Sequence, residues 1–368
     1  MAPGDAPELC DVCGSSALIE IKCKMICRNC GTIVRSCADL SEPLGWRAMT
    51  LLAVTCAVSV SCASRHPAQT NRTATKSTSQ IGLWDAHTHL SWYGEAALDS
   101  LTAYGVVGVR DCGGDAIQLR TWRDEIARGT RRGPRIYFSG PVIDGGDKTA
   151  SAFRVLVSTP EQATRVVDSL AALGVDFIKT HNGIPHDAFF AVIRAARAHG
   201  LKVAAHLPKG VPAWVAADSG VAGIEHAAES MLASPIYAGY ATDITGAIAW
   251  WRSAAGDSAL AKLARQGVTV TPTLVTYKSF VNLPADEESR RGRAAVLVFL
   301  EELTGRMHRA GITLLAGSDF ARPSSGIVPG RATREEVELL IASGLTRAEA
   351  TDAASGAIQR WVQKRRRP

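Results

Sequence analysis

From residue 81 onward, short apolar runs alternate with longer stretches in which apolar residues recur every three or four positions. The short runs are typical of buried strands, and the longer stretches are typical of helices that bury one face. This order predicts strand–helix units in a parallel sheet. The expected strands lie at 81–87, 105–110, 135–139, 175–180, 201–206, 222–226, 267–272 and 312–317. The expected helices lie at 95–103, 116–128, 159–173, 186–199, 211–219, 257–266, 292–310, 334–341 and 347–363.

Glycines mark the boundaries between these units. A glycine stands at the start of six expected strands or within two residues before it: Gly105, Gly174, Gly200, Gly220, Gly267 and Gly311. Glycine adopts at little cost the left-handed conformation that ends many helices, so these positions support the proposed boundaries. Eight strands, each followed by a helical stretch, predict an α/β fold of the (β/α)8 TIM-like barrel type. We assign residues 81–368 to this barrel.

Side chains that can bind a metal ion stand at the C-terminal ends of five expected strands. The first strand ends with His87-Thr88-His89, and residues two apart in a strand share a face, so both imidazoles can point to one ion. The other members follow the fourth, fifth, sixth and eighth strands: Lys179, His206, His226 and Asp319. One histidine after a strand is usually a packing residue. The ordered set predicts a metal centre, because reactive groups of such barrels lie at the C-terminal strand ends.

The motifs that contain these residues resemble those of the amidohydrolase superfamily of metal-dependent hydrolases, in the branch related to imidazolonepropionase and prolidase-like peptidases. The resemblance covers residues 83–361 and is carried by Asp85-Ala-His87-Thr-His89, Gly108-Val-Arg110-Asp111-Cys-Gly113-Gly114, Phe177-Ile-Lys179, Ala205-His206, Ile224-Glu-His226-Ala and Gly317-Ser-Asp319. Many members of that superfamily add a small β-sandwich around the barrel. Only a polar tether precedes His87 here, so we expect a barrel that lacks most or all of the accessory β-sandwich.

The resemblance implies a pair of divalent metal ions, and histidine with carboxylate suits zinc. We assign His87, His89 and Asp319 to one ion, and His206 and His226 to the other. An ammonium group cannot bind a metal ion, and the resemblance implies that Lys179 is carboxylated to a carbamate that bridges both ions. The predicted reaction is hydrolysis of an amide, peptide or lactam by a metal-bridging hydroxide, with Asp319 as the proton shuttle. The predicted catalytic residues are Asp319, Lys179 and His206.

Further residues are candidates for substrate binding. His181 lies two residues beyond Lys179, where it can bind a substrate oxygen, support a neighbouring residue or lie at the surface. Four others lie in expected loops or helix starts after strands, where a free carboxylate can be held: Arg154, Tyr237, Tyr277 and Arg322. Two alternative functions stay open. The same metal pair can hydrolyse an ester or a lactone, and the chain can instead be a zinc-ribbon interaction protein with an inactive barrel.

Cysteine is concentrated at the N-terminus, where eight of the nine cysteines lie at or before Cys62. The main body is therefore not a disulfide scaffold. Cys10-x-x-Cys13 and Cys27-x-x-Cys30 have the spacing of two knuckles that surround one tetrahedral zinc. Residues 1–45 thus resemble a zinc ribbon, with a structural zinc bound by Cys10, Cys13, Cys27 and Cys30.

Residues 46–80 contain an apolar run from Met49 to Cys62 and then a polar tether rich in serine and threonine. The run is shorter than the roughly 20 residues of a membrane-spanning helix and resembles the apolar region of a signal peptide. We hypothesise that translation begins near Met49 and that Cys62 carries a lipid anchor. That start predicts a cell-envelope protein, whereas a start at Met1 predicts a cytoplasmic one.

Composition is consistent with a large folded body. Of the 368 residues, 46% are hydrophobic and 21% are charged, which is close to the average for globular proteins. The net charge of +6 is small for this length and no long basic stripe runs through the chain, so nucleic acid is not an expected partner. The expected partner is a small amide or peptide substrate, and the sequence indicates no oligomeric state.

Overall fold

The computed structural model describes residues 82–146, 148–321 and 326–363, together with the backbone of three short N-terminal strands. Those strands are β1 (Leu18–Ile21), β2 (Lys24–Cys27) and β3 (Ile33–Ser36), and they pair in antiparallel fashion.

Several residues that carry sequence predictions lie outside the described part of the chain. They are Cys10, Cys13, Cys30, Met49, Cys62 and Arg322, while Cys27 is described by its backbone alone. The structural zinc, the signal-like segment and the lipid anchor therefore stay predictions.

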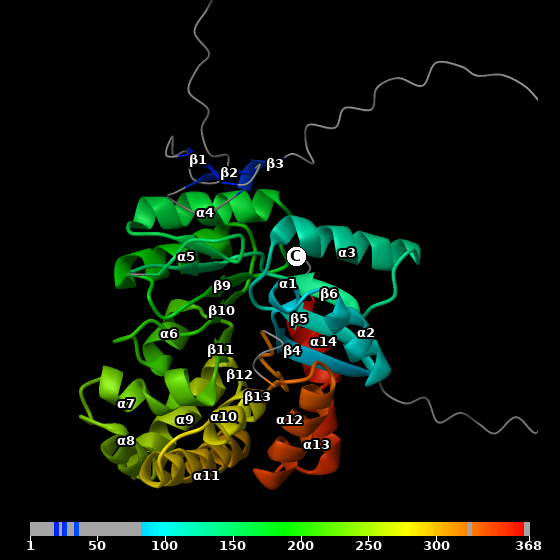
Figure 1. The fold of residues 1–368 in the computed structure, drawn as a ribbon. Coiled ribbons are helices and arrows are strands. Elements are labelled where there is room, and N and C mark those ends of the chain that lie inside the picture. Colours follow the sequence, from blue (N-terminus) through cyan, green and yellow to red (C-terminus); the bar gives the residue numbers. More distant parts are fainter. Residues whose placement is uncertain are drawn as a thin grey trace, which may run out of the picture.

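Two parallel sheets occupy the centre of the molecule (Figure 1). The first has the order β4 (Leu83–Thr88), β5 (Val106–Asp111) and β6 (Arg135–Phe138). The second has the order β13-β12-β11-β10-β9-β7-β8. Its strands are β7 (Val142–Asp144), β8 (Arg154–Leu156), β9 (Ile178–Thr180), β10 (Val203–Ala205), β11 (Gly223–Glu225), β12 (Thr269–Thr271) and β13 (Thr313–Leu314). All pairings within both sheets are parallel, which confirms the predicted α/β class.

Backbone hydrogen bonds link the two sheets at two places. Beside β4, the Asp319 amide donates to the His87 carbonyl at 2.7 Å and the Ala86 amide donates to the Ala316 carbonyl at 2.8 Å. Beside β6, the Asp176 amide donates to the Phe138 carbonyl at 2.9 Å. The segments that lead into β9 and out of β13 thus run next to the first sheet. Closure into one eight-stranded barrel stays a prediction.

Helices surround the strands (Figure 1). They are α1 (Leu90–Tyr93), α2 (Ala96–Ala103), α3 (Ala116–Arg128), α4 (Pro160–Ala172), α5 (His186–Ala198), α6 (Ala213–Ser219), the π-helical η2 (Ala227–Leu232), α7 (Ser234–Tyr237), α8 (Ile244–Trp251), α9 (Ala254–Gln266), α10 (Leu274–Val281), α11 (Glu287–Arg309), α12 (Arg331–Ala342), α13 (Arg347–Ala353) and α14 (Gly356–Val362). N-cap residues fix where several of these helices begin. The side chains of Asp115, Thr159 and Asp243 accept hydrogen bonds from the first free amides of α3, α4 and α8.

The structure adds elements that the hydrophobic pattern did not predict. Among them are the strands β7 and β8 and the helices α8 and α10. The helix predicted at 347–363 is wrong as one unit, because it is divided into α13 and α14 around Ser355. The break lets α14 turn its buried residues Ile358 and Trp361 toward the strands.

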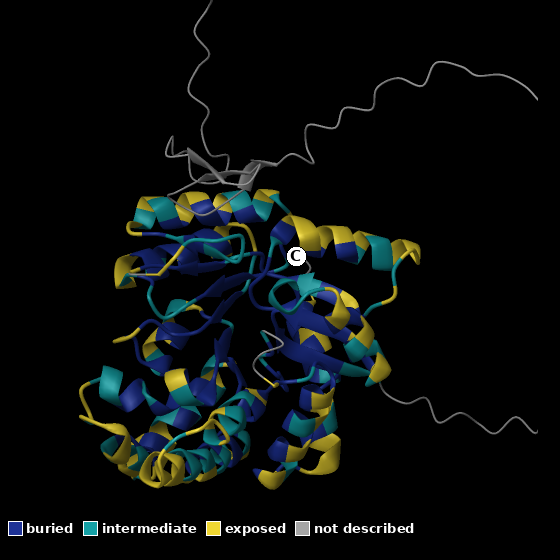
Figure 2. Cartoon of the chain, in the orientation of Figure 1, coloured by how far each residue is buried: buried dark blue, intermediate teal, exposed yellow. Residues whose placement is uncertain are grey.

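Apolar side chains form two packed clusters. The larger one lies between the strands and the helices, and Figure 2 shows buried central strands beside helices with exposed outer faces. The smaller one joins Trp84 of β4, Phe177 and Leu315 to Trp361 of α14. The Trp361 indole also donates a 3.3 Å hydrogen bond to the Ala222 carbonyl, so α14 is fixed beneath the strands. Within the described residues, no helix combines the length and apolarity needed to cross a lipid bilayer.

Candidate metal centre

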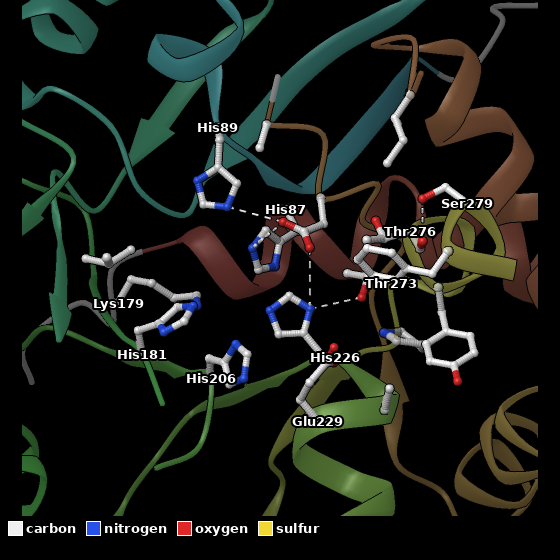
Figure 3. Close-up of a pocket in the computed structure, with 18 of the residues that line it drawn as sticks. His87, His89, Lys179, His181, His206, His226, Glu229, Thr273, Thr276 and Ser279 are labelled. Atoms are coloured by element: carbon white, nitrogen blue, oxygen red, sulfur yellow. Dashed lines mark hydrogen bonds and ion pairs between the residues drawn. The ribbon is translucent and has the colours of Figure 1, made fainter. Parts of the chain in front are cut away.

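A cavity of about 310 Å³ lies at the C-terminal ends of the strands. Its lining includes every residue predicted for the metal centre: His87, His89, Lys179, His206, His226 and Asp319. Figure 3 labels the four histidines and Lys179. These side chains come from distant parts of the chain. They meet because parallel strands direct their C-terminal ends to the same side of a sheet.

The Asp319 carboxylate lies close to two imidazoles, that of His87 in β4 and that of His89 directly after the strand. Its Oδ1 atom is 3.4 Å from His87 Nε2 and 3.2 Å from His89 Nε2. The ligand atoms of these three residues all lie within 4.8 Å of one another, which one metal ion can span. Burial opposes ionisation of Asp319, but the neighbouring His87 and His89 lower the pKa of its carboxyl below the usual value. The carboxylate is therefore available as a ligand.

His206 and His226 lie next to this group. Their ring centroids are 4.6 Å apart, and the rings of His226 and His87 are 4.8 Å apart. Burial lowers the pKa of both His206 and His226 well below the usual value. Both rings are thus neutral near pH 7, and the neutral imidazole is the form that binds metal ions.

Two buried imidazole nitrogens support a metal at this place. Nε2 of His87 and Nε2 of His206 have no hydrogen-bond partner in the described part of the chain. Buried polar atoms are nearly always paired in folded proteins, so these nitrogens fit a site that binds an ion. The donor set of imidazole nitrogen and carboxylate oxygen fits divalent zinc.

Lys179 of β9 reaches the same cavity. Its side chain is buried, and its Nζ donates a 3.2 Å hydrogen bond to the Thr180 carbonyl. Burial lowers the pKa of the Lys179 amine below the usual value. A larger fraction of this amine is therefore neutral, which is the form able to react with carbon dioxide.

A buried ion pair between Arg110 and Glu225 contacts the His87 ring at the nitrogen that faces away from the cavity. His87 Nδ1 donates to Glu225 Oε2 at 2.7 Å, and Arg110 Nη2 donates to the two Glu225 oxygens at 2.6 and 2.8 Å. The Arg110 guanidinium also lies 4.4 Å from the Trp361 ring centre. Because a carboxylate only accepts hydrogen bonds, Nδ1 carries the proton and Nε2 faces the cavity with its lone pair. These roles of Arg110 and Glu225 were not predicted from the sequence, although both residues lie in the quoted motifs.

Unusual backbone conformations accompany the site. In the described part of the chain, the non-glycine residues with positive φ are His226 at 69°, Thr273 at 52° and Asp319 at 48°. Each such residue costs on the order of 1–3 kcal/mol, and strain of this kind clusters at functional sites. The Thr273 hydroxyl oxygen also lies 3.0 Å from His226 Nδ1. The sequence gives no pattern that marks Thr273, because the strain arises from tertiary packing.

Only some of the candidate substrate-binding residues line the cavity. His181, Arg154 and Tyr277 line the cavity. Tyr237 is not among the lining residues, and its hydroxyl donates to the Glu229 carbonyl at 3.4 Å. Asp144, which the sequence analysis missed, joins two of the candidates, since its Oδ2 lies 3.1 Å from Arg154 Nε and 3.3 Å from His181 Nδ1.

Comparisons with known proteins bear on the fold. No protein-family model matches the chain, and a search of curated proteins gave no match. The structure is similar to bottromycin amidohydrolase, with a TM-score of 0.59 and 23% identity over 77% of this chain and 67% of that one. It is similar to a protein assigned as a prolidase from Bifidobacterium longum, with a TM-score of 0.57 and 26% identity over 77% of this chain and 69% of that one. It is also similar to ochratoxinase from A. niger, with a TM-score of 0.57 and 18% identity over 77% of this chain and 71% of that one. The chain thus shares its fold with amidohydrolases.

Proposed function

We propose that this chain is a metal-dependent hydrolase that cleaves a carbon–nitrogen bond in a small amide, peptide or lactam. The observation that carries the proposal is Asp319, whose carboxylate lies within 3.4 Å of two imidazoles in a cavity that also contains Lys179, His206 and His226. The fold supports it, because solved structures that share it include a bottromycin amidohydrolase and a Xaa-Pro dipeptidase.

The proposed site holds two divalent ions, with zinc favoured by the imidazole-rich donors. His87, His89 and Asp319 would bind one ion, and His206 and His226 the other, with carboxylated Lys179 between them. The unpaired Nε2 atoms of His87 and His206 support this assignment. Bound ions of this type polarise a carbonyl group and lower the pKa of water to about 7.

The protein's own groups supply orientation and proton transfer. Asp319 accepts the proton of the attacking water at Oδ2 and delivers it to the leaving nitrogen, as general acid–base catalysis requires. Its side chain is 19% exposed, so water in the cavity can reach it. Arg154 and His181 bind a carboxylate of the substrate, and Asp144 holds both side chains in place.

The proposal extends to the organisation of the chain. Residues 81–368 form a closed (β/α)8 barrel, which the hydrogen bonds between the two sheets support. Residues 1–45 form a zinc-binding module, on the cysteine spacing alone, and residues 46–80 form a signal-like segment and tether.

Metal analysis combined with kinetics tests the function. We expect wild-type protein to contain stoichiometric divalent metal and to hydrolyse members of a library of dipeptides, N-acyl amino acids and lactams. His206→Ala should lose one barrel ion and lower kcat/KM at least about 100-fold, since even residues that only support a ligand change activity by 10–100-fold. His199→Ala is the matched control, because His199 is a half-exposed residue that pairs with Asp168 on the surface.

The opposite results would contradict the proposal. They are protein without stoichiometric transition metal, or a His206→Ala variant that hydrolyses amides as fast as the wild type. Matched amide and ester substrates then separate this function from ester or lactone hydrolysis at the same centre.

A further inference from the structure

Glu229 places a carboxyl group on the cavity wall that the proposed chemistry does not use. Glu229 and Asp319 are the acidic residues among those that line the cavity. Glu229 lies in η2, three residues after His226, and Figure 3 shows the two side by side. Its side chain is exposed to solvent and makes no ion pair with any residue in the described part of the chain. An unpaired carboxylate in a substrate cavity is suited to bind a cationic group.

A cationic side chain, Arg154, lies at the other end of the site. The His181 and His206 ring centroids are 4.5 Å apart, and those of His206 and His226 are 4.6 Å apart, so the three rings form a row. Arg154 joins the His181 end of this row through Asp144. Glu229 follows the His226 end. The cavity therefore has Arg154 at one end and Glu229 at the other, with proposed metal ligands between them.

The dimensions fit a short zwitterion. The centroid distances of 4.5 and 4.6 Å put the outer rings of the row no more than about 9 Å apart, and two amino acid residues in extended form span at most about 7 Å. A cavity of about 310 Å³ is at the lower end of the range for small-molecule sites. A dipeptide can thus place its carboxylate at Arg154 and His181, its peptide bond at the centre, and its ammonium group at Glu229.

We propose that Glu229 binds the free ammonium group of the substrate and so selects unblocked dipeptides over N-acyl amino acids. The inference rests on the proposed function, which leaves the kind of carbon–nitrogen substrate open. A charge-assisted hydrogen bond to a carboxylate changes affinity by about 10–100-fold. We therefore expect an effect of that size on the preference between free and acylated substrates.

The test compares kcat/KM for Phe-Ala and N-acetyl-Phe-Ala with zinc-loaded, full-length protein. The aromatic residues Trp92, Tyr277 and Phe280 on the cavity wall favour a phenylalanine side chain. Wild type should prefer Phe-Ala by at least about tenfold, and Glu229→Gln should bring the ratio of the two kcat/KM values close to one. Glu229→Lys should reverse the charge preference and favour N-succinyl-Phe-Ala over Phe-Ala. Glu338→Gln, which changes an exposed glutamate paired with Arg347, should keep the wild-type ratio.

The outcomes separate the two proposals. Hydrolysis of both substrates with a wild-type ratio near one, or a Glu229→Gln variant that keeps the wild-type ratio, overturns the role of Glu229 and leaves the hydrolase function intact. Absence of hydrolysis across the whole substrate library, Phe-Ala included, overturns both. Melting temperatures equal to that of the wild type show that the variants are folded.

Discussion

Three of the four histidines proposed as metal ligands are each held by a second group. His87 Nδ1 bonds Glu225, His89 Nδ1 bonds the Gly113 carbonyl at 2.9 Å, and His226 Nδ1 lies 3.0 Å from the Thr273 hydroxyl. A hydrogen bond at one ring nitrogen fixes the tautomer and the direction of the other nitrogen. These supporting groups therefore decide which imidazole lone pairs face the cavity.

Thr273 offers a direct test of this support. Thr273→Val keeps the branched shape but removes the hydroxyl beside His226, so the ring loses its fixed orientation. We expect affinity for the barrel metal to fall by about 10–100-fold, as for other groups that orient metal ligands, and kcat to fall with it. Competition with a chelator measures the metal affinity.

Ser279→Ala is the control for Thr273→Val. Ser279 also lines the cavity, but its hydroxyl donates to the Thr276 carbonyl. Equal metal affinity in Thr273→Val and in wild type would show that His226 does not need this contact.

At the scale of elements, α12 connects several of the loops around the site. Thr333 of α12 donates to Asp85 Oδ2 at 2.6 Å, and Asp85 also accepts from the Ser318 amide at 3.0 Å. Glu336, one turn further along α12, accepts from the amides of Leu274 and Val275 at 3.1 and 2.8 Å. This helix therefore fixes the middle of β4, the loop that carries Asp319, and the start of α10.

Glu336 should make the stability of the fold depend on pH. Burial raises the pKa of Glu336 from 4.5 to about 8 in the folded protein. The folded state thus binds more protons than the unfolded state between these values, so stability falls as pH rises from about 5 to 8. Glu336 lowers the free energy of unfolding by up to about 1.4 kcal/mol for each unit by which the pH rises in this range. In Glu336→Gln, the free energy of unfolding should fall less steeply with pH.

Denaturant titrations at several pH values measure this difference. Glu335→Gln is the matched control, because Glu335 is the preceding residue, is partly exposed and pairs with Lys278 at 2.7 Å. Parallel stability curves for wild type and Glu336→Gln across pH 5 to 8 would rule out the raised pKa.

The helix α14 should stabilise the fold through Trp361. This indole is 6% exposed, contacts Arg110 and Phe177, and bonds the Ala222 carbonyl. Trp361→Ala should reduce the free energy of unfolding by about 3–5 kcal/mol, the usual cost of truncating a buried aromatic residue. Trp361→Phe keeps a ring in the cluster and should lose less. A loss under about 1 kcal/mol in Trp361→Ala would show that α14 adds little to the fold.

The sequence predicted the elements whose signal is local. The strand that carries Lys179 and the strand before His206 follow from apolar runs preceded by a glycine, and the strand that carries His87 follows from its apolar run alone. The order of these strands brings the proposed ligands together. α10 was missed because its N-terminus is fixed by Glu336, which lies 62 positions later than Leu274, rather than by a neighbouring cap. β7 and β8 follow β6 with no helix between them, so the alternation of strand and helix that marked the other short strands is absent here. Asp144 and Glu229 were missed because their roles depend on neighbours that only the fold supplies.

At the scale of the whole molecule, the site and its support are confined to one part of the chain. Every residue that lines the cavity lies between His87 and Ile327, and the smaller apolar cluster extends from Trp84 to Val362. The solved structures that share the fold match 77% of the chain. The N-terminal cysteines therefore have no expected part in the reaction itself.

Removal of residues 1–80 should leave metal binding in the barrel and hydrolysis unchanged, because no cavity-lining residue is lost. Metal analysis should give three zinc ions per full-length chain, with one on the four N-terminal cysteines, and two per chain for residues 81–368. Full-length protein with both Cys10→Ser and Cys13→Ser should also contain two, since a structural zinc needs its complete set of ligands. If residues 81–368 keep two ions but lose hydrolysis while the double variant stays active, then the first 80 residues contribute to the active site by a route other than their zinc.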